Sequence, residues 1–364
     1  MRYGIVGNKN VKRLPRDRIA YLDFLRVFSM IFVVMIHVVF DLFNNAAVSS
    51  SEWQIFNAYD SLSRWSVPVF VMISGALFLD SKKPFGQILK KNVLRLAIAY
   101  VVWTIIYSII CNIYYNDFNT TLDQLINGHF HMWFILMMIG LYLVTPLLRK
   151  IVEEKSTIRL FLILALIFAM FLPDLVKVLE SFPSLTTQKI IQFVNQTKYN
   201  FNVFVPLGYA GYFVLGYVLN KFEISKKLEW AIYIMGVAGF VYTLLATYLR
   251  SNAAHFAYVG FYEYTSTNVA MMAAAVFVFF KKHYHVKKSD SLYSKTVSRL
   301  SKYSFGVYLV HVAVLEYMTV RLHYSPMAYS PLISSPVFCI VTLIISYVIS
   351  FILNQIPFLN DCIV

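Results

Sequence analysis

An arginine and a histidine lie eleven residues apart in the first apolar stretch of the chain. This stretch, residues 20–43, reads AYLDFLRVFSMIFVVMIHVVFDLF and contains Arg26 and His37. At about 100° per residue, eleven steps along an α-helix return to within roughly 20° of the same face, with a rise of about 16 Å. An ionisable side chain inside a membrane helix is costly, so such residues often mark functional sites. We therefore expect Arg26 and His37 to line one stripe of one membrane helix.

The residue types in this stretch are suited to acid–base chemistry and to anion binding. His37 could act as a general base near neutral pH, or it could be a buried histidine that links helices. Asp41, one turn further on, could orient the His37 ring as carboxylates do in catalytic triads, or it could mark the outer interface. Arg26 has a planar fork that suits phosphate oxygens. Asp23, three residues earlier, could instead hold Arg26 in a structural ion pair.

The rest of the chain has the composition of a membrane protein with several spans. Of its 364 residues, 59% are hydrophobic and only 14% are charged, whereas a soluble domain has about 25% charged residues. A bilayer-spanning helix needs about 20 apolar residues. We predict an all-α integral membrane protein with ten spans near residues 20–43, 64–80, 93–114, 131–150, 157–172, 201–219, 228–248, 267–280, 303–321 and 333–354. Polar loops are expected over 44–63, 116–130 and 173–200.

The positive charge is concentrated between alternate spans. A net charge of +14 would suggest nucleic-acid binding in a soluble protein, but here Lys and Arg follow the positive-inside rule. We therefore expect no nucleic-acid partner, a bilayer around the chain, and both termini in the cytoplasm. Residues 1–364 are expected to form one membrane domain, with 1–18 as a basic cytoplasmic arm. The first apolar run is too long for a signal peptide and should remain as the first helix.

Four motifs, in chain order, resemble the bacterial membrane acyltransferase family 3. They are LDFLR with a histidine eleven residues after its arginine, starting at Leu22; SRWSVPVFVMISGALFL from Ser63; HMWFILMMIGLYLVTPLLR from His131; and YSFGVYLVH ending at His311. The resemblance is closest to the branch that contains the O-acetyltransferase of enterobacterial common antigen. It implies an enzyme of the bacterial inner membrane. Such an enzyme moves an acyl group, usually acetyl, from cytoplasmic acyl-CoA to a hydroxyl of an envelope glycan or sugar-lipid.

The resemblance also implies which residues bind the donor. Arg26 and His37 match the essential arginine and histidine of the family's first helix. Arg95 matches the second member of a paired-arginine motif at the start of the third span, where the first position is Asn92 in this chain. We expect Arg26, Arg95 and Lys91 to bind acyl-CoA, which serves as the donor substrate, with no metal required. Basic residues at a cytoplasmic face can also simply set topology or contact anionic lipid.

Polar and aromatic side chains at the ends of other spans are candidates for binding the acceptor: Arg64, His131, Trp133, Tyr308 and His311. Trp133 could equally belong to an interfacial aromatic belt, and His311 could form only a packing hydrogen bond with its own helix. His37 would then either deprotonate the acceptor hydroxyl or carry the acyl group transiently. His37 and Arg26 are the expected catalytic residues.

Other functions are compatible with buried charges in a membrane. The main alternative is a transporter or flippase of lipid-linked sugars or small polar solutes. Transporters often contain inverted repeats and paired broken helices, which the sequence does not clearly show. A weaker alternative is an amino-acid acceptor or a sensing role. Homo-oligomers are among the assemblies we consider. The three cysteines, Cys111, Cys339 and Cys362, have no paired spacing and predict neither a disulfide nor a metal site.

Overall fold

The computed structural model describes residues 17–182, 184–201, 207–284 and 292–357, and in these ranges it contains helices and no strand. The all-α prediction is confirmed for this part of the chain. The expected basic arm lies almost entirely outside the described residues. The helices are α1 (Asp17–Asn45), α2 (Ser51–Ser63), α3 (Ser66–Phe78), α4 (Phe85–Ile88), α5 (Leu94–Tyr115), α6 (Phe118–Asn127), α7 (Trp133–Leu143), α8 (Thr145–Ile151), α9 (Lys155–Leu164), α10 (Leu172–Leu179), α11 (Leu185–Phe201), α12 (Leu207–Lys221), α13 (Lys226–Ala254), α14 (Thr267–His283), α15 (Leu292–Glu316) and α16 (Pro331–Leu353).

Eight helical segments of the described chain are long and apolar enough to cross a bilayer. They cover residues 20–45, 51–78, 85–115, 118–143, 155–179, 226–254, 295–321 and 331–353. α12 and α14, with 15 and 17 residues, occupy the places of the sixth and eighth predicted spans. Each of the ten predicted spans therefore overlaps at least one helix of the described residues. The count of ten spans and the cytoplasmic position of the termini stay predictions.

Three segments that we predicted to be polar loops contain helices. α2 lies within 44–63, α6 lies within 116–130, and α10 and α11 occupy much of 173–200. Side chains cap the N-termini of α2 and α6. Ser50 accepts a hydrogen bond from the backbone N–H of Trp53, and Asp117 accepts hydrogen bonds from the backbone N–H groups of Asn119 and Thr120. Such caps satisfy backbone donors that the first helical turn leaves free. The loop prediction was wrong: α2, α6 and α11 were missed because they contain more polar residues than the predicted spans, whereas α10 extends the helical segment of the fifth predicted span.

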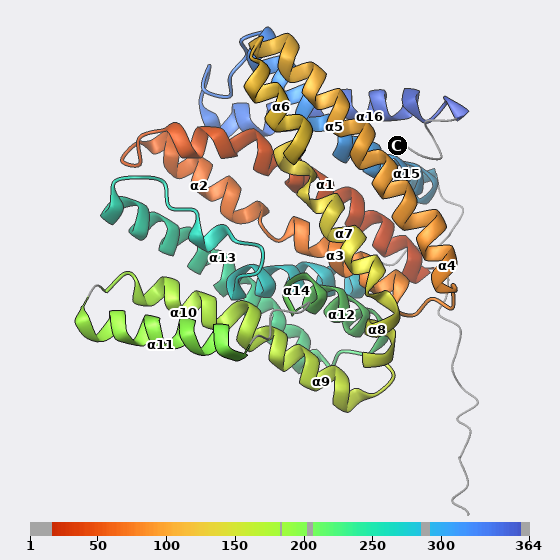
Figure 1. The fold of residues 1–364 in the computed structure, drawn as a ribbon, viewed down its shortest axis with the longest axis vertical. Coiled ribbons are helices and arrows are strands. Elements are labelled where there is room, and N and C mark those ends of the chain that lie inside the picture. The colour runs from red at the N-terminus through yellow and green to blue at the C-terminus, as the bar shows by residue number, and fades with distance from the viewer. Residues whose placement is uncertain (1–16, 183, 202–206, 285–291, 358–364) are drawn as a thin grey trace, which may run out of the picture.

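The first helix occupies the centre of the bundle (Figure 1). α1 packs against α2, α3, α14, α15 and α16. It contributes to both hydrophobic clusters of the core, with Tyr21 and Leu25 in one and Val34 and Val39 in the other. In Figure 1, α9 to α11 lie at the opposite end of the molecule from α15 and α16. Side chains on different faces of α1 therefore contact different helices of the bundle.

Two glycines bring α3 and α12 into close contact. A Cβ atom at Gly75 would lie 1.8 Å from the carbonyl oxygen of Phe213, and one at Gly216 would lie 2.0 Å from that of Met72. Small residues allow this approach of helix backbones, which is common between membrane helices. The contact fixes α3 against α12, and the opposite face of α3 forms a wall of the site described next.

Candidate active site

A cavity of about 360 Å³ lies between α1, α3, α5, α7 and α15. Four residues of α1 line it: Arg26, Met30, Val33 and His37. Their spacing of four, three and four residues is that of one face of an α-helix. The structure thus places Arg26 and His37 on one stripe, and this stripe faces a cavity that joins them.

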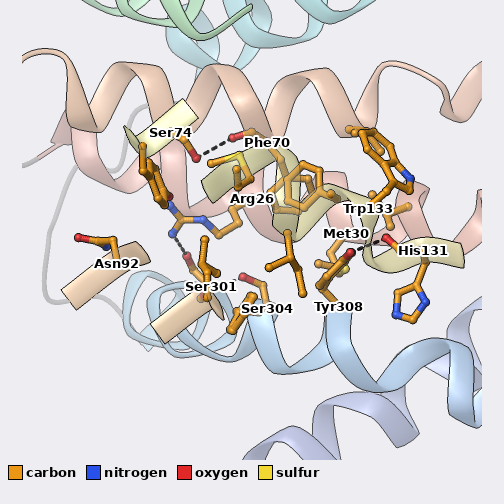
Figure 2. Close-up of a pocket in the computed structure, with 18 of the residues that line it drawn as sticks. Arg26, Met30, Phe70, Ser74, Asn92, His131, Trp133, Ser301, Ser304 and Tyr308 are labelled. Carbon is orange, nitrogen blue, oxygen red and sulfur yellow. Dashed lines mark hydrogen bonds between the residues drawn. The ribbon is translucent and has the colours of Figure 1, made fainter. Parts of the chain in front are cut away.

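One end of the cavity is cationic. Nη1 of Arg26 donates hydrogen bonds to Oγ of Ser301, at 2.8 Å, and to Oδ1 of Asp23, at 3.3 Å, and the Ser301 hydroxyl donates to the same Asp23 oxygen at 2.7 Å. Figure 2 shows the Arg26–Ser301 bond at this end. Arg95 and Lys302 line the cavity as well. Three cations therefore surround this space, and the Asp23 carboxylate opposes the charge of Arg26.

The start of α5 determines which of its residues reach the cavity. A π-helical turn, Leu89–Val93, comes directly before α5, and such turns are frequent at functional sites. Asn92 and Arg95 line the cavity, whereas Lys91 is exposed and does not. Lys302 of α15, which sequence reasoning did not single out, lines the cavity instead. Its only signal in the sequence was its position among many Lys residues before the ninth span.

Histidines gather at the other end of the cavity, which His37 and His131 line. The ring centroid of His37 lies 5.0 Å from that of His311 and 6.2 Å from that of His131. The rings of His131 and His311 are 5.5 Å apart, and both side chains are buried. Nδ1 of His311 lies 2.7 Å from the carbonyl oxygen of Tyr308 on its own helix. The structure brings together three histidines from spans that are far apart in sequence.

A fourth histidine, His129, contacts His131 and is not among the residues that line the cavity. Nδ1 of His129 lies 2.8 Å from Nδ1 of His131, and its Nε2 lies 3.0 Å from Oε1 of Glu316. The ring of Tyr107 stacks on His129 with centroids 4.3 Å apart. Sequence reasoning missed His129 because it lies in a segment that we predicted to be a loop. The signal was present as a pair of histidines two residues apart.

The hydroxyl of Tyr308 positions the backbone that carries these rings. It donates a hydrogen bond of 2.6 Å to the carbonyl oxygen of His131, which Figure 2 shows. Asp41, by contrast, is exposed, and the described residues contain no hydrogen bond between Asp41 and His37. The structure therefore does not show Asp41 orienting the His37 ring.

Arg64 belongs to a second, more open hollow of about 370 Å³. It forms a buried ion pair with Asp60, and its guanidinium carbon lies 4.4 Å from the centroid of the Tyr262 ring. Ion pairing and an aromatic face together compensate for the burial of an arginine. Arg64 is thus a fixed cation in the wall of this hollow, outside the lining of the first cavity.

Trp133 and Tyr264 line both hollows. Their rings are stacked, with centroids 5.7 Å apart and planes at 24°, and Tyr209 packs against the Trp133 ring at 5.6 Å. Trp133 is therefore part of the wall between two hollows rather than an isolated ring at the membrane surface. Three of the five acceptor candidates line the first cavity: His131, Trp133 and Tyr308. His311 adjoins His37, and Arg64 lines the second hollow.

Comparison with known proteins assigns the chain to a family. The family model described as an acyltransferase domain, acyltransferase family 3, matches residues 19–351. Neither the curated proteins nor the solved structures gave a match. The matched range includes every residue that lines the cavity between Arg26 and His37. Because the match covers nearly the whole length, the chain belongs to acyltransferase family 3.

Proposed function

We propose that this membrane acyltransferase moves an acetyl group from acyl-CoA to a hydroxyl of an envelope glycan or sugar-lipid in the bacterial inner membrane. The observation that carries the proposal is the single cavity with Arg26, Arg95 and Lys302 at one end and His37 and His131 at the other. Such a transfer needs a binding site for the anionic donor and a group able to take a proton. Cationic side chains suited to the donor line one end of the cavity, and histidines able to take a proton line the other.

The cationic end is suited to the phosphate groups of CoA. Arginine binds phosphate through a planar fork and lysine binds it as a point charge. Asp23 and Ser301 hold Arg26 before any ligand arrives, which reduces the entropy lost on binding. The middle of the cavity is apolar, with Met30, Val33 and other hydrophobic side chains. The flexible arm that carries the thioester would lie along this part and reach His37.

His37 is the group that we propose to perform the chemical step. As a general base it takes the proton of the acceptor hydroxyl while the oxygen attacks the thioester carbonyl and the CoA thiolate leaves. As a nucleophile it accepts the acyl group first and passes it to the acceptor second. Arg26 would bind the donor or stabilise the negative charge that develops during the reaction. Both routes need the thioester at the His37 end.

The second hollow is the proposed entry site of the acceptor. Aromatic side chains dominate its lining, with the Trp133 ring stacked on Tyr264 and in tilted contact with Tyr209, and Arg64 belongs to the same lining. Flat aromatic faces pack well against sugar rings, and Arg64 supplies a donor for hydroxyl or carboxylate oxygens. Resemblance to the branch with the enterobacterial common antigen enzyme makes an amphipathic glycan of this kind the first acceptor to test.

The test compares His37→Ala with His283→Ala, which removes an exposed histidine outside the cavity lining. Membranes containing each variant receive labelled acetyl-CoA, and mass spectrometry measures acetylation of the envelope glycans. We expect His37→Ala to insert normally but to lose acetylation by a factor of about 100 or more, whereas His283→Ala retains it. Unchanged acetylation in His37→Ala would reject the assignment. Flux of a polar solute without release of CoA would favour the transporter hypothesis.

A further inference from the structure

A row of titratable side chains leads away from the histidine end of the cavity. It runs from His131 through His129 to Glu316, with heavy-atom distances of 2.8 Å and 3.0 Å. His131 and His129 are 2% and 4% exposed, whereas 24% of the Glu316 side chain is exposed. The row therefore connects a buried wall of the cavity with a carboxylate that reaches the solvent-accessible surface.

The inner end of this row has an unused polar atom. Nε2 of His131 is buried and has no hydrogen-bond partner among the described residues, although His131 lines the cavity. A buried polar atom without a partner costs about 1–3 kcal/mol, so a substrate or water is expected to satisfy it. The ring of His37 has its centroid 6.2 Å away, a separation that one bridging water can span.

The hydrogen-bond pattern determines which proton each ring carries. A neutral imidazole has one donor nitrogen and one acceptor nitrogen. If Nε2 of His129 donates to the Glu316 carboxylate, Nδ1 of His129 must accept, and Nδ1 of His131 must donate to it. Nε2 of His131 is then left as an acceptor that faces the cavity. Each member of the row is thus oriented to take a proton on its inner side and give one on its outer side.

Two tyrosines hold the row in this geometry. Tyr107 stacks on the His129 ring at 26° between planes, and its own hydroxyl donates to the carbonyl oxygen of Leu309 at 2.7 Å. Tyr308 donates to the His131 carbonyl oxygen. Rings fixed from two sides keep the short contacts that proton transfer between nitrogen atoms requires.

We propose that His131, His129 and Glu316 form a proton relay that carries the acceptor's hydroxyl proton out of the cavity during acyl transfer. This inference rests on the proposed function, with His37 acting as the general base. It assigns a task to His129 and Glu316, neither of which touches the reacting atoms in this scheme. His129 and Glu316 are therefore positioning and relay residues rather than groups that bind substrate.

The proposed step transfers the acyl group to the acceptor and moves one proton along the relay. The acceptor O–H bond breaks, its proton passes through His37 and one water to Nε2 of His131, and the oxygen bonds to the acyl carbon. The C–S bond breaks and CoA leaves as the thiolate, which takes a proton from water at the cationic end. The Nδ1 proton of His131 moves to His129, and the Nε2 proton of His129 moves to Glu316. Glu316 releases one proton to water, so one proton is released at one end and one is taken up at the other.

Other ionisable groups lie close enough to Glu316 to need a control. They interact electrostatically with Glu316 or with its neighbours, and they come from α1, α5, the start of α6 and the turn that follows α15: Asp41, Tyr107, Cys111, Tyr114, Tyr115, Asp117 and Arg321. Asp41 is a suitable carboxylate for comparison, because it interacts electrostatically with Glu316, is exposed and forms no hydrogen bond with the relay in the described part of the chain. Asp41→Asn therefore changes local charge without interrupting the row.

The experiment uses the full chain in detergent, labelled acetyl-CoA as donor and a lipid-glycan extract of bacterial envelopes as acceptor probe. Glu316→Gln, His129→Gln and Asp41→Asn are compared with the unaltered protein. We expect the first two to lower kcat by about tenfold to a hundredfold with the KM for acetyl-CoA unchanged within twofold. Added imidazole buffer should restore part of the loss by carrying the proton, and the solvent deuterium isotope effect should rise. Asp41→Asn should retain the original kcat.

Three outcomes would overturn the relay. The first is an unchanged kcat in both relay variants, and the second is a loss that imidazole does not restore and that leaves the isotope effect unaltered. The second outcome would assign Glu316 a structural role. If Glu316→Gln fails to fold, Glu316→Asp, which keeps the carboxylate, must retain imidazole-independent turnover while His129→Gln does not. The third is failure of the unaltered protein to consume acetyl-CoA, which rejects the proposed function itself, and the relay with it.

Discussion

At the scale of single residues, Arg26 shows how neighbours prepare a side chain for a ligand. Asp23, on the same helix, balances its charge, and Ser301, from α15, fixes its position. The Asp23 contact was foreseeable from the sequence, because residues three apart on a helix face each other. Ser301 was not foreseeable, since nothing in one sequence tells which turn of α15 meets α1. The same reason hid Lys302, which lies next to Ser301 on α15, whereas His129 was missed because it lies in a predicted loop.

Substitution of Arg26 tests whether its geometry matters beyond its charge. Arg26→Lys keeps the charge but loses the planar fork, so we expect the KM for acetyl-CoA to rise about tenfold, and Arg26→Ala to raise it further. Steady-state kinetics with labelled acetyl-CoA measures this. Arg159→Lys, at an exposed site outside the cavity, is the matched control and should leave KM unchanged. A normal donor KM in Arg26→Ala would remove Arg26 from the donor site.

At the scale of helices, hydrophobic runs were sufficient to place the spans but not the helices between them. Each predicted span overlaps at least one helix of the described chain, because a long apolar run has few other stable conformations in a bilayer. The sequence analysis missed α2, α6 and α11 because apolar residues occupy only part of the surface of each helix. Their start signals, such as Asp117 before α6, were readable in the sequence and were outweighed by their overall polarity.

The contact between α3 and α12 gives a prediction at this scale. A methyl group at Gly75 has no room beside the Phe213 backbone, whereas one at Gly140 on α7 meets nothing within 4 Å. Overpacking of this kind costs about 1–3 kcal/mol. We expect Gly75→Ala to lower the thermal unfolding midpoint by several degrees, and Gly140→Ala to leave it unchanged or slightly higher. Fluorescence-monitored unfolding in detergent checks both, and equal midpoints would show that the helix pair adapts.

At the scale of the whole molecule, the sequence predicts an orientation that the fold alone does not reveal. Lys and Arg cluster between alternate predicted spans, and this bias orients membrane proteins during insertion. The cationic end of the cavity, with Arg95 and Lys302, would then face the cytoplasm, where acyl-CoA is made. The Glu316 end would face the other side. The position of the cavity between helices could not be predicted, because it depends on how distant spans pack.

Orientation can be measured with single cysteines at two exposed sites, Lys155→Cys and Ser184→Cys. The positive-inside rule places residue 155 in the cytoplasm and residue 184 outside. We therefore expect a membrane-impermeant maleimide to label Ser184→Cys in intact cells and Lys155→Cys only after the membrane is opened. Cys111 and Cys339 are buried, so the unaltered protein serves to measure background labelling. The reverse pattern would invert the proposed direction of transfer.

The stacked rings of Trp133 and Tyr264 lie between the two hollows. This position affects how much donor would be lost to hydrolysis in the proposed reaction. A thioester in the first cavity would be open to hydrolysis if bulk water could enter freely from the acceptor side. An aromatic partition would slow that entry. An enzyme built this way would waste little of its activated donor while it waits for an acceptor.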